Sequence, residues 1–157
     1  MKIIIIVYSY HHGNTKKIAD TIGKMLETEI KTINEITPSE AAAYEVIGLG
    51  AGIDSGRHYN PLLEFAKALP NANGQKTFIF STAGVAGKER KKHSDHKALR
   101  VILQSKGYEI LDEFACKGFN TNSILKYFGG MNKGRPNTED LNNAVVFAEN
   151  LKNRVKQ

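Results

Sequence analysis

The chain has few of the features that stabilise small secreted proteins or anchor membrane proteins. Its 157 residues include one cysteine, Cys116, and no tryptophan. A single cysteine excludes an internal disulfide and the paired cysteines of a zinc site. The longest apolar run, residues 3–8, is far shorter than the roughly 20 residues of a membrane span, and no small-residue cleavage site follows it. We therefore expect a cytoplasmic protein that does not associate with a membrane.

Several nucleotide-binding and hydrolytic signatures are also missing. Gly48, Gly50 and Gly52 lack the third spacing of a dinucleotide-binding fingerprint. The chain has no Gly-Lys-Ser/Thr triplet of a nucleoside triphosphate loop and no Gly-x-Ser-x-Gly elbow of a hydrolase. His93 and His96 have a helical spacing that would suit two metal ligands, but we interpret them as solvated histidines.

The composition is that of one globular domain covering residues 1–157. An apolar fraction of 41% and a charged fraction of 24% are ordinary for such a domain. The net charge of +6 arises in the second half of the chain, where the densest basic cluster comprises Lys88, Arg90, Lys91, Lys92 and Lys97. Aromatic residues are not interleaved with these charges, which argues against a nucleic-acid partner. The cluster is either a solvated helix start or a face that docks an acidic partner.

Residues 3–15 predict a buried strand, a tight polar loop and the start of a helix. The strand is a β-branched apolar run without alternation, and Asn14 or Thr15 is expected to cap the helix. Free N–H groups at a helix N-terminus attract anions, and the hydroxyls of Ser9 and Thr15 could add donors. Lys16 and Lys17 oppose the helix dipole by roughly 0.3 to 1 kcal/mol each, which a bound phosphate would reverse. The alternative is an ordinary turn with two solvated lysines.

Apolar and amphipathic segments alternate along the rest of the chain. Further strands are expected at residues 29–34, 46–50, 77–81 and 109–115. Helices are expected at residues 61–69, 94–106 and 139–155. Thr138 is the expected cap of the last helix, Gly107 the expected stop of the one before it, and residues 118–137 a Gly-rich irregular excursion.

This alternation predicts an α/β fold with a five-stranded parallel sheet and helices on both faces. Ligands bind such sheets beyond the carboxyl ends of the strands. Three predicted loops leave those ends, at residues 9–15, 51–60 and 82–87. Their shared position is a stronger indication of a binding site than any one loop.

Residues 8–19, Tyr-Ser-Tyr-His-His-Gly-Asn-Thr-Lys-Lys-Ile-Ala, resemble the phosphate loop of the flavodoxins, which holds the phosphate of FMN. Residues 53–59 and 81–87 are similar to the other two flavin loops of that family. Residues 116–119 and 132–136 resemble a subgroup of short flavodoxin-like proteins, so the likeness covers nearly the whole chain. It implies a single flavodoxin-like three-layer sandwich with strand order 2-1-3-4-5, and FMN as the cofactor.

The resemblance also implies which residues bind FMN. The phosphate is expected on the first loop, at Ser9, Tyr10, His11, His12, Gly13, Asn14 and Thr15. The ring is expected between the second loop, at Ile53, Asp54, Ser55, Gly56, His58 and Tyr59, and the third, at Thr82, Ala83, Gly84, Val85 and Gly87. Tyr59 and His58 are expected against the flat ring, the alternative being that they only cover the surface. Neither a catalytic residue of the chain's own nor a metal ligand is expected.

Three residues of the second loop bear on redox chemistry. In this family a peptide that flips near the flavin N5 stabilises the half-reduced flavin, and the resemblance points to the Ser55-Gly56 peptide. Asp54 near the ring would repel the anionic reduced form and lower the second potential, and Arg57 would oppose it. Cys116, by contrast, is expected to be a small buried residue rather than a redox thiol.

The first loop departs from the family pattern at Tyr10, His11 and His12, where flavodoxins usually carry hydroxyl residues. Imidazole N–H groups would then replace hydroxyl donors. Because histidine titrates near pH 6.5, we expect tighter FMN binding at mildly acidic pH. The alternative is that both imidazoles point outward and backbone N–H groups bind the phosphate. A flat affinity from pH 6 to 8 would count against His11 and His12 as ligands.

The leading functional hypothesis is an electron carrier that passes low-potential electrons between redox partners. Carriers of this family are usually acidic and this chain is basic, so we expect acidic partners such as a ferredoxin-like protein or an oxidoreductase. The alternative is an FMN-dependent NAD(P)H:quinone or small-acceptor reductase. A weaker third possibility is a flavodoxin-like module that has lost the cofactor. We expect a monomer or a weak dimer.

Overall fold

A sheet of mostly buried β-branched and aromatic residues forms the centre of the protein. The computed structural model describes residues 1–9, 13–84, 89–118 and 134–157. The sheet comprises β1 (Ile3–Tyr8), β2 (Glu29–Thr32), β3 (Val46–Asp54), β4 (Arg57–His58), β5 (Lys76–Ala83) and β6 (Glu109–Lys117). Its main path, β2-β1-β3-β5-β6, is parallel, and β4 pairs antiparallel with β3. With β4 set aside, this is the predicted order 2-1-3-4-5, and the fold class is confirmed.

Three strands extend further at their carboxyl ends than the sequence predicts. β3 continues to Asp54 because Ala51 and Gly52 still have partners on β5, while Ile53 and Asp54 pair with β4. The predicted loop at residues 51–60 is therefore largely a β-hairpin. β5 and β6 likewise run two residues beyond the predicted ends at 81 and 115, since they remain paired there. β2, in contrast, ends two residues earlier than predicted.

Six helices are described: α1 (Asn14–Leu26), α2 (Pro38–Ala41), α3 (Asn60–Ala68), α4 (Glu89–Asp95), α5 (Lys97–Ser105) and α6 (Thr138–Val155). The short α2 was not predicted, although Thr37 and Glu40 form a capping box there. The predicted helix at residues 94–106 is two helices that meet at His96. Gly107 has φ 85°, in keeping with the predicted stop after α5. None of the described helices combines the length and the apolar character needed to cross a bilayer.

Two predicted helix caps are corrected. The N-cap of α1 is Gly13, with φ 63° and no side-chain hydrogen bond, rather than Asn14 or Thr15. Both of those side chains are buried against β5 and β6 instead of facing the helix end. The N-cap of α6 is Asn137, whose side chain accepts a hydrogen bond from the Asp140 N–H in a capping box. Thr138, the predicted cap, is the first helical residue. Within the predicted excursion at 118–137, residues 119–133 lie outside the described part of the chain.

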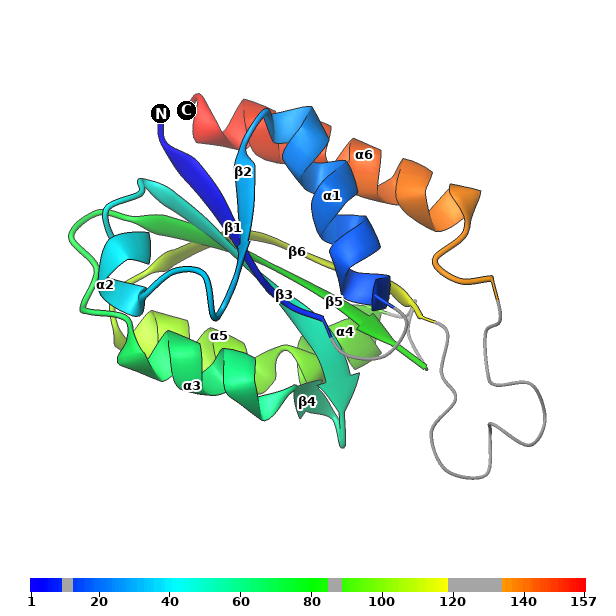
Figure 1. Ribbon diagram of the computed structural model, residues 1–157, viewed down its shortest axis with the longest axis horizontal. Coiled ribbons are helices and arrows are strands. Elements are labelled where there is room, and N and C mark those ends of the chain that lie inside the picture. Colours follow the sequence, from blue (N-terminus) through cyan, green and yellow to red (C-terminus); the bar gives the residue numbers. More distant parts are fainter. Residues whose placement is uncertain (10–12, 85–88, 119–133) are drawn as a thin grey trace.

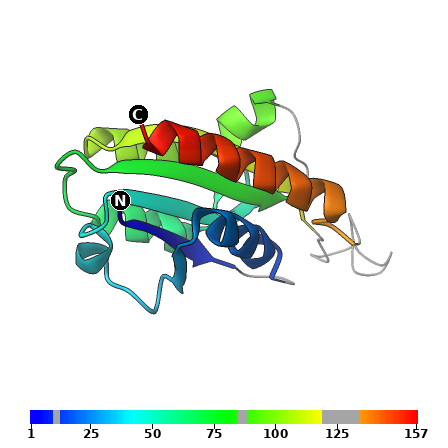
Figure 2. The same cartoon turned by 90° about the horizontal axis from the view of Figure 1, so that it is seen from above.

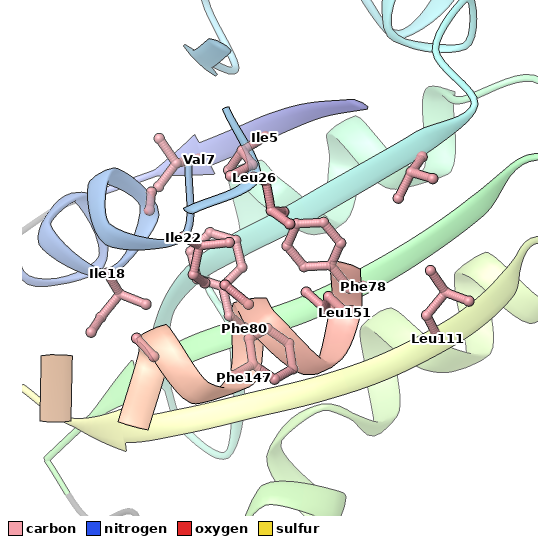
Figure 3. Close-up of a cluster of buried hydrophobic side chains, with 14 of the residues drawn as sticks. Ile5, Val7, Ile18, Ile22, Leu26, Phe78, Phe80, Leu111, Phe147 and Leu151 are labelled. Carbon is pink, nitrogen blue, oxygen red and sulfur yellow. The ribbon is translucent and has the colours of Figure 1, made fainter. Parts of the chain in front are cut away.

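The helices form layers on the two faces of the sheet, with α1 and α6 on one face and α3 to α5 on the other (Figures 1 and 2). We call the surface under α1 and α6 the aromatic face, because Phe78, Phe80 and Phe147 pack there (Figure 3). Phe114 packs against the same cluster. A Cβ at Gly50 would lie 2.1 Å from the Phe80 ring, so β3 must carry glycine beneath it. The opposite face is packed by aliphatic side chains, among them Ile4, Ile47, Leu49, Leu62 and Leu99.

Candidate functional site

The carboxyl ends of β1, β3, β5 and β6 lie side by side at one edge of the sheet. Tyr8 is paired with Ala51, and Thr82 is paired with Gly52 on one side and Cys116 on the other. The three segments expected to form the site therefore meet at this edge, which we call the carboxyl edge. Figure 1 shows the start of α1 at the same edge.

The first segment leads into the N-terminus of α1. The Lys16 backbone N–H donates to the Ser9 hydroxyl over 3.3 Å, which joins the residue after β1 to the first turn of α1. Gly13 has φ 63°, and a Cβ built on it would meet no atom of the described residues within 4 Å. The Lys16 side chain forms an ion pair with Asp20, one turn further along the helix. Tyr10, His11 and His12 lie outside the described residues.

Asn14 and Thr15 join the first segment to the third. The hydroxyls of Thr15 and Thr82 are 2.9 Å apart, and both side chains are buried. The Asn14 amide lies over Gly118, where an added Cβ would come within 2.8 Å of Nδ2. The Thr15 and Thr82 hydroxyls, both expected at the ligand, thus hydrogen-bond each other. Backbone N–H groups at the start of α1 remain as candidate donors among the described residues.

The second segment is the β3–β4 hairpin. Ile53 is paired with His58 and Asp54 with Arg57, so Ser55 and Gly56 form a two-residue turn. Their φ values of 52° and 78° are both positive, as in the type I′ turn that suits a right-twisted hairpin. Residues 54–57 are exposed, and a Cβ at Gly56 would meet no described atom within 4 Å. The hairpin therefore presents its tip, including the Ser55-Gly56 peptide, to solvent.

Tyr59 follows the hairpin and packs along its base. Its N–H donates to the Gly52 carbonyl over 3.1 Å, and its ring meets the Tyr8 ring edge-on, with centroids 5.9 Å apart. A Cβ at Gly52 would come within 2.7 Å of the Tyr59 ring, so only glycine admits this packing. Tyr59 is half-buried here and connects the first and second segments.

The structure corrects the expectation that His58 lies against a flavin ring. Its side chain has no exposed surface. Its Nε2 is 3.1 Å from the Phe80 carbonyl oxygen of β5, and its ring centroid is 4.8 Å from that of His96. The alternation of side chains along β4 explains this placement, because the neighbours Arg57 and His58 point to opposite sides and only Arg57 faces water.

His58 belongs to a polar cluster that the sequence did not reveal, consisting of His58, Ser81, His96, Arg100 and Glu113. His96 Nε2 is 2.7 Å from the Ser81 hydroxyl, and His96 Nδ1 is 2.9 Å from a Glu113 carboxylate oxygen. Arg100 donates to both Glu113 oxygens, from Nε over 2.7 Å and from Nη2 over 2.8 Å. His96 is fully buried, so its interpretation as a solvated histidine was wrong. The one local indication of the polar cluster in the sequence is the i,i+4 spacing of His96 and Arg100, which places both side chains on the same side of a helix.

Burial and pairing set the charges of the polar cluster. Burial lowers the pKa of His58 to about 3, so its imidazole is neutral at physiological pH. Burial alone would raise the pKa of Glu113, but hydrogen bonds from His96 and Arg100 outweigh it and lower that pKa to about 2. Ser81, His96 and Glu113 have the hydrogen-bond order of a nucleophile, a base and an acid. Ser81 is only 1% exposed, however, so no substrate reaches its hydroxyl.

The third segment is the end of β5 and the residues after it. Thr82 and Ala83 are the last two residues of the strand rather than loop, and Gly84 follows in a bend. Val85 and Gly87 lie outside the described residues. On the neighbouring β6, Cys116 is buried as predicted, and burial raises the pKa of its thiol to about 12. Among the described residues, no three His, Cys, Asp or Glu side chains converge to hold a metal ion.

The strand order of the sheet and the three segments that meet at its carboxyl edge define an α/β protein with a flavodoxin-like fold. A model of the flavodoxin domain family matches residues 5–152, and the chain belongs to this family. An uncharacterized protein of Methanocaldococcus jannaschii is 45% identical over 151 residues, which cover 96% of this chain and 98% of that protein.

Solved structures of the same fold are more distant in sequence. Flavodoxin 2 of Bacillus cereus superposes with a TM-score of 0.73 at 18% identity, covering 98% of this chain and 99% of that one. A Fusobacterium nucleatum flavodoxin bound to flavin mononucleotide has a TM-score of 0.59 at 16% identity, covering 95% and 98% of the two chains. At these identities the likeness concerns the fold.

Proposed function

We propose that this protein binds FMN at the carboxyl edge and carries single low-potential electrons between redox partners. One observation carries most of the weight: three segments far apart in the sequence meet at the edge where α/β sheets of this kind bind ligands. Membership of the flavodoxin domain family and the FMN-bound F. nucleatum flavodoxin of the same fold support the choice of cofactor.

The residues present at the edge fit such a cofactor. Backbone N–H groups at the start of α1 would hold the phosphate, where a Cβ built on Gly13 would meet no atom of the described residues within 4 Å. The exposed Ser55-Gly56 turn and the end of β5 at Thr82 to Gly84 would flank the ring. Bound FMN supplies the one-electron and two-electron redox chemistry, while the chain orients it and sets its surroundings.

Charge at the hairpin tip is the chain's own means of biasing the potential. Asp54 and Arg57 lie opposite each other in the register of β3 and β4, and both are exposed. A carboxylate beside the ring disfavours a further negative charge on the reduced cofactor and lowers the second potential, and the guanidinium offsets part of this effect. Asp54→Asn is therefore expected to raise the second potential, and Arg57→Gln to lower it.

We further propose acidic redox partners. The start of α5 carries the exposed Lys97, and α4 carries Lys91 and Lys92, which contact Asp95 and the Glu113 carbonyl respectively. Together with the net charge of +6, these residues favour a negatively charged partner surface. Raising the salt concentration should slow electron transfer to an acidic partner such as a ferredoxin, because screening weakens long-range attraction.

Stepwise reduction of the FMN-loaded protein, followed by visible absorption, tests the proposal. An electron carrier should take up two electrons in two separate steps and should react slowly with NADH or NADPH alone. A single two-electron step with rapid turnover of nicotinamide and quinone would instead indicate a reductase. Failure of the purified protein to take up FMN would refute the cofactor assignment.

A further inference from the structure

The β3–β4 hairpin has an exposed tip and one fully buried anchor. Residues 54–57 face water, whereas His58 has no exposed surface. The carbonyl of Phe80 can only accept a hydrogen bond, so the His58 Nε2–H must donate to it over 3.1 Å. Although β4 pairs with β3, this side-chain bond attaches the hairpin to β5. Phe80 lies two residues before Thr82, the residue that meets Thr15.

The surroundings of His58 offer a proton no compensating charge. The charged groups that act on it are His96 at the start of α5, Arg100 on α5 and Glu113 on β6. Helix α4, which packs against β4, carries the buried Asp95, and the hairpin itself carries the exposed Asp54 and Arg57. Glu113 is already paired with Arg100, and Asp95 with Lys91. The carboxylates of Glu113 and Asp95 thus each have a cationic partner already, so neither is available to pair with a protonated His58.

The second ring nitrogen of His58 makes the imidazole still less tolerant of a proton. Nδ1 is buried and has no hydrogen-bond partner among the described residues. In the neutral Nε2–H tautomer, Nδ1 is a bare acceptor. A proton there would add both an unpaired buried N–H group and an unpaired buried charge, each of which is unfavourable away from water. The lowered pKa of His58 agrees with this geometry.

We propose that His58 is a positioning residue for the candidate FMN site: its neutral imidazole holds the β3–β4 hairpin against β5, and protonation releases the hairpin. The anchoring role stands on the contacts of His58 alone. Its consequence for FMN rests on the function proposed above, since the hairpin carries the Ser55-Gly56 turn that would flank the ring.

Proton linkage gives the size of the expected effect. When the hairpin opens, His58 reaches water and regains an ordinary pKa near 6.5, whereas in the closed hairpin it stays neutral. Opening is therefore favoured by the factor 1 + 10^(6.5 − pH), which is about 1 at pH 7.5 and about 11 at pH 5.5. The open population of the hairpin should rise about tenfold over this range.

Amide hydrogen exchange of the cofactor-free protein tests the anchor directly. The Tyr59 N–H, which donates to the Gly52 carbonyl, reports hairpin opening. After correction for intrinsic rates, its protection should fall about tenfold between pH 7.5 and pH 5.5. His58→Gln keeps a donor for the Phe80 carbonyl but does not titrate, so its protection should not change over this range. The Glu35 N–H, which donates to the Thr32 carbonyl just after the outermost strand β2, is the internal control.

A flat Tyr59 profile in the unmodified protein, or the same tenfold change in His58→Gln, would overturn the anchoring role. His93→Gln is the matched control, because His93 is an exposed histidine on the neighbouring helix α4 and should leave the Tyr59 profile unchanged. The three proteins differ in which imidazole is present, so the comparison isolates the buried one.

FMN titrations at pH 7.5 test the consequence for the site. His58→Leu removes the donor to the Phe80 carbonyl and should raise the Kd for FMN about fivefold to tenfold, whereas His58→Gln and His93→Gln should stay near the unmodified value. Near-equal affinities of His58→Leu and the unmodified protein would overturn positioning. If none of the four proteins binds FMN, the proposed function fails, and the exchange experiment still decides on the anchor.

Discussion

The two faces of the sheet hold the carboxyl edge by different chemistry. On the aromatic face, Phe80 and Phe114 lie on neighbouring strands, and the Phe147 ring packs 5.3 Å from that of Phe114. On the other face, the next residue of β5, Ser81, belongs to the polar cluster with Glu113 of β6. Alternation along the strands separates the two environments by a single residue. The stability of the aromatic face depends on how well large side chains fill its volume. The stability of the polar cluster depends on its hydrogen bonds and on which of its groups carry a proton.

The largest expected effect comes from emptying the aromatic face. Phe80→Ala removes a fully buried ring and should lower the free energy of unfolding by about 3 to 5 kcal/mol, measured by urea denaturation. In the Phe80→Ala background, Gly50→Ala should be much less harmful than alone, because the added Cβ then enters vacated space. Additive effects of the two substitutions would show that the Gly50–Phe80 contact does not limit packing.

Removing the guanidinium from the polar cluster should have the next largest effect. Arg100→Met leaves the largely buried Glu113 carboxylate without its bidentate partner and should cost about 2 to 3 kcal/mol in the free energy of unfolding. Adding Glu113→Gln should restore part of the stability, since the unpaired charge is gone. A double variant no more stable than Arg100→Met would contradict the assignment of the loss to that charge.

Acidification should distinguish the two faces. The pKa of His58 is about 3 in the folded protein and 6.5 when unfolded, so its stabilising contribution is complete above pH 6.5 and declines as the pH falls toward 3. At pH 5 the loss relative to pH 8 is about 2 kcal/mol. Because the pKa of Glu113 is lowered to about 2, its own contribution declines only below about pH 4.5. Urea denaturation at pH 5 and pH 8 should show this loss of unfolding free energy in Phe80→Leu, which changes the aromatic face but keeps His58. His58→Gln, which lacks the imidazole, should show a much smaller loss.

The smallest effect is expected at the helix cap beside the aromatic face. Asn137→Ala breaks the capping box with Asp140 and should cost about 1 kcal/mol, measured by thermal or urea denaturation. Thr138→Ala is the matched control, because Thr138 is inside α6 and does not cap it. Equal losses in the two variants would contradict the assignment of the cap to Asn137.

Features that depend on local pattern were predictable from the sequence. The apolar runs at 3–8 and 77–81 fixed two strands, and the loop leading into α1 indicated the binding edge. The hairpin was missed because Ser55 and Gly56 were interpreted as loop residues, although Ser-Gly is also a hairpin turn signal. The polar cluster joins residues that are far apart in the sequence: His58 contacts the Phe80 carbonyl, and His96 contacts Ser81 and Glu113. No local sequence pattern predicts such contacts. The burial of His58 follows from the pairing of β4, which the sequence alone did not reveal.

An amide-resolved NMR titration of the protein with FMN tests the central claim most directly. Saturable shifts with one equivalent of FMN are expected at Gly13 to Lys16, at Gly52 to Gly56 and at Thr82 to Gly84, the three segments that meet at the carboxyl edge. The Ala72 N–H, which donates to the Lys106 carbonyl near the amino ends of β5 and β6, should not respond. An absence of saturable shifts, or shifts confined to residues away from the carboxyl edge, would contradict the account.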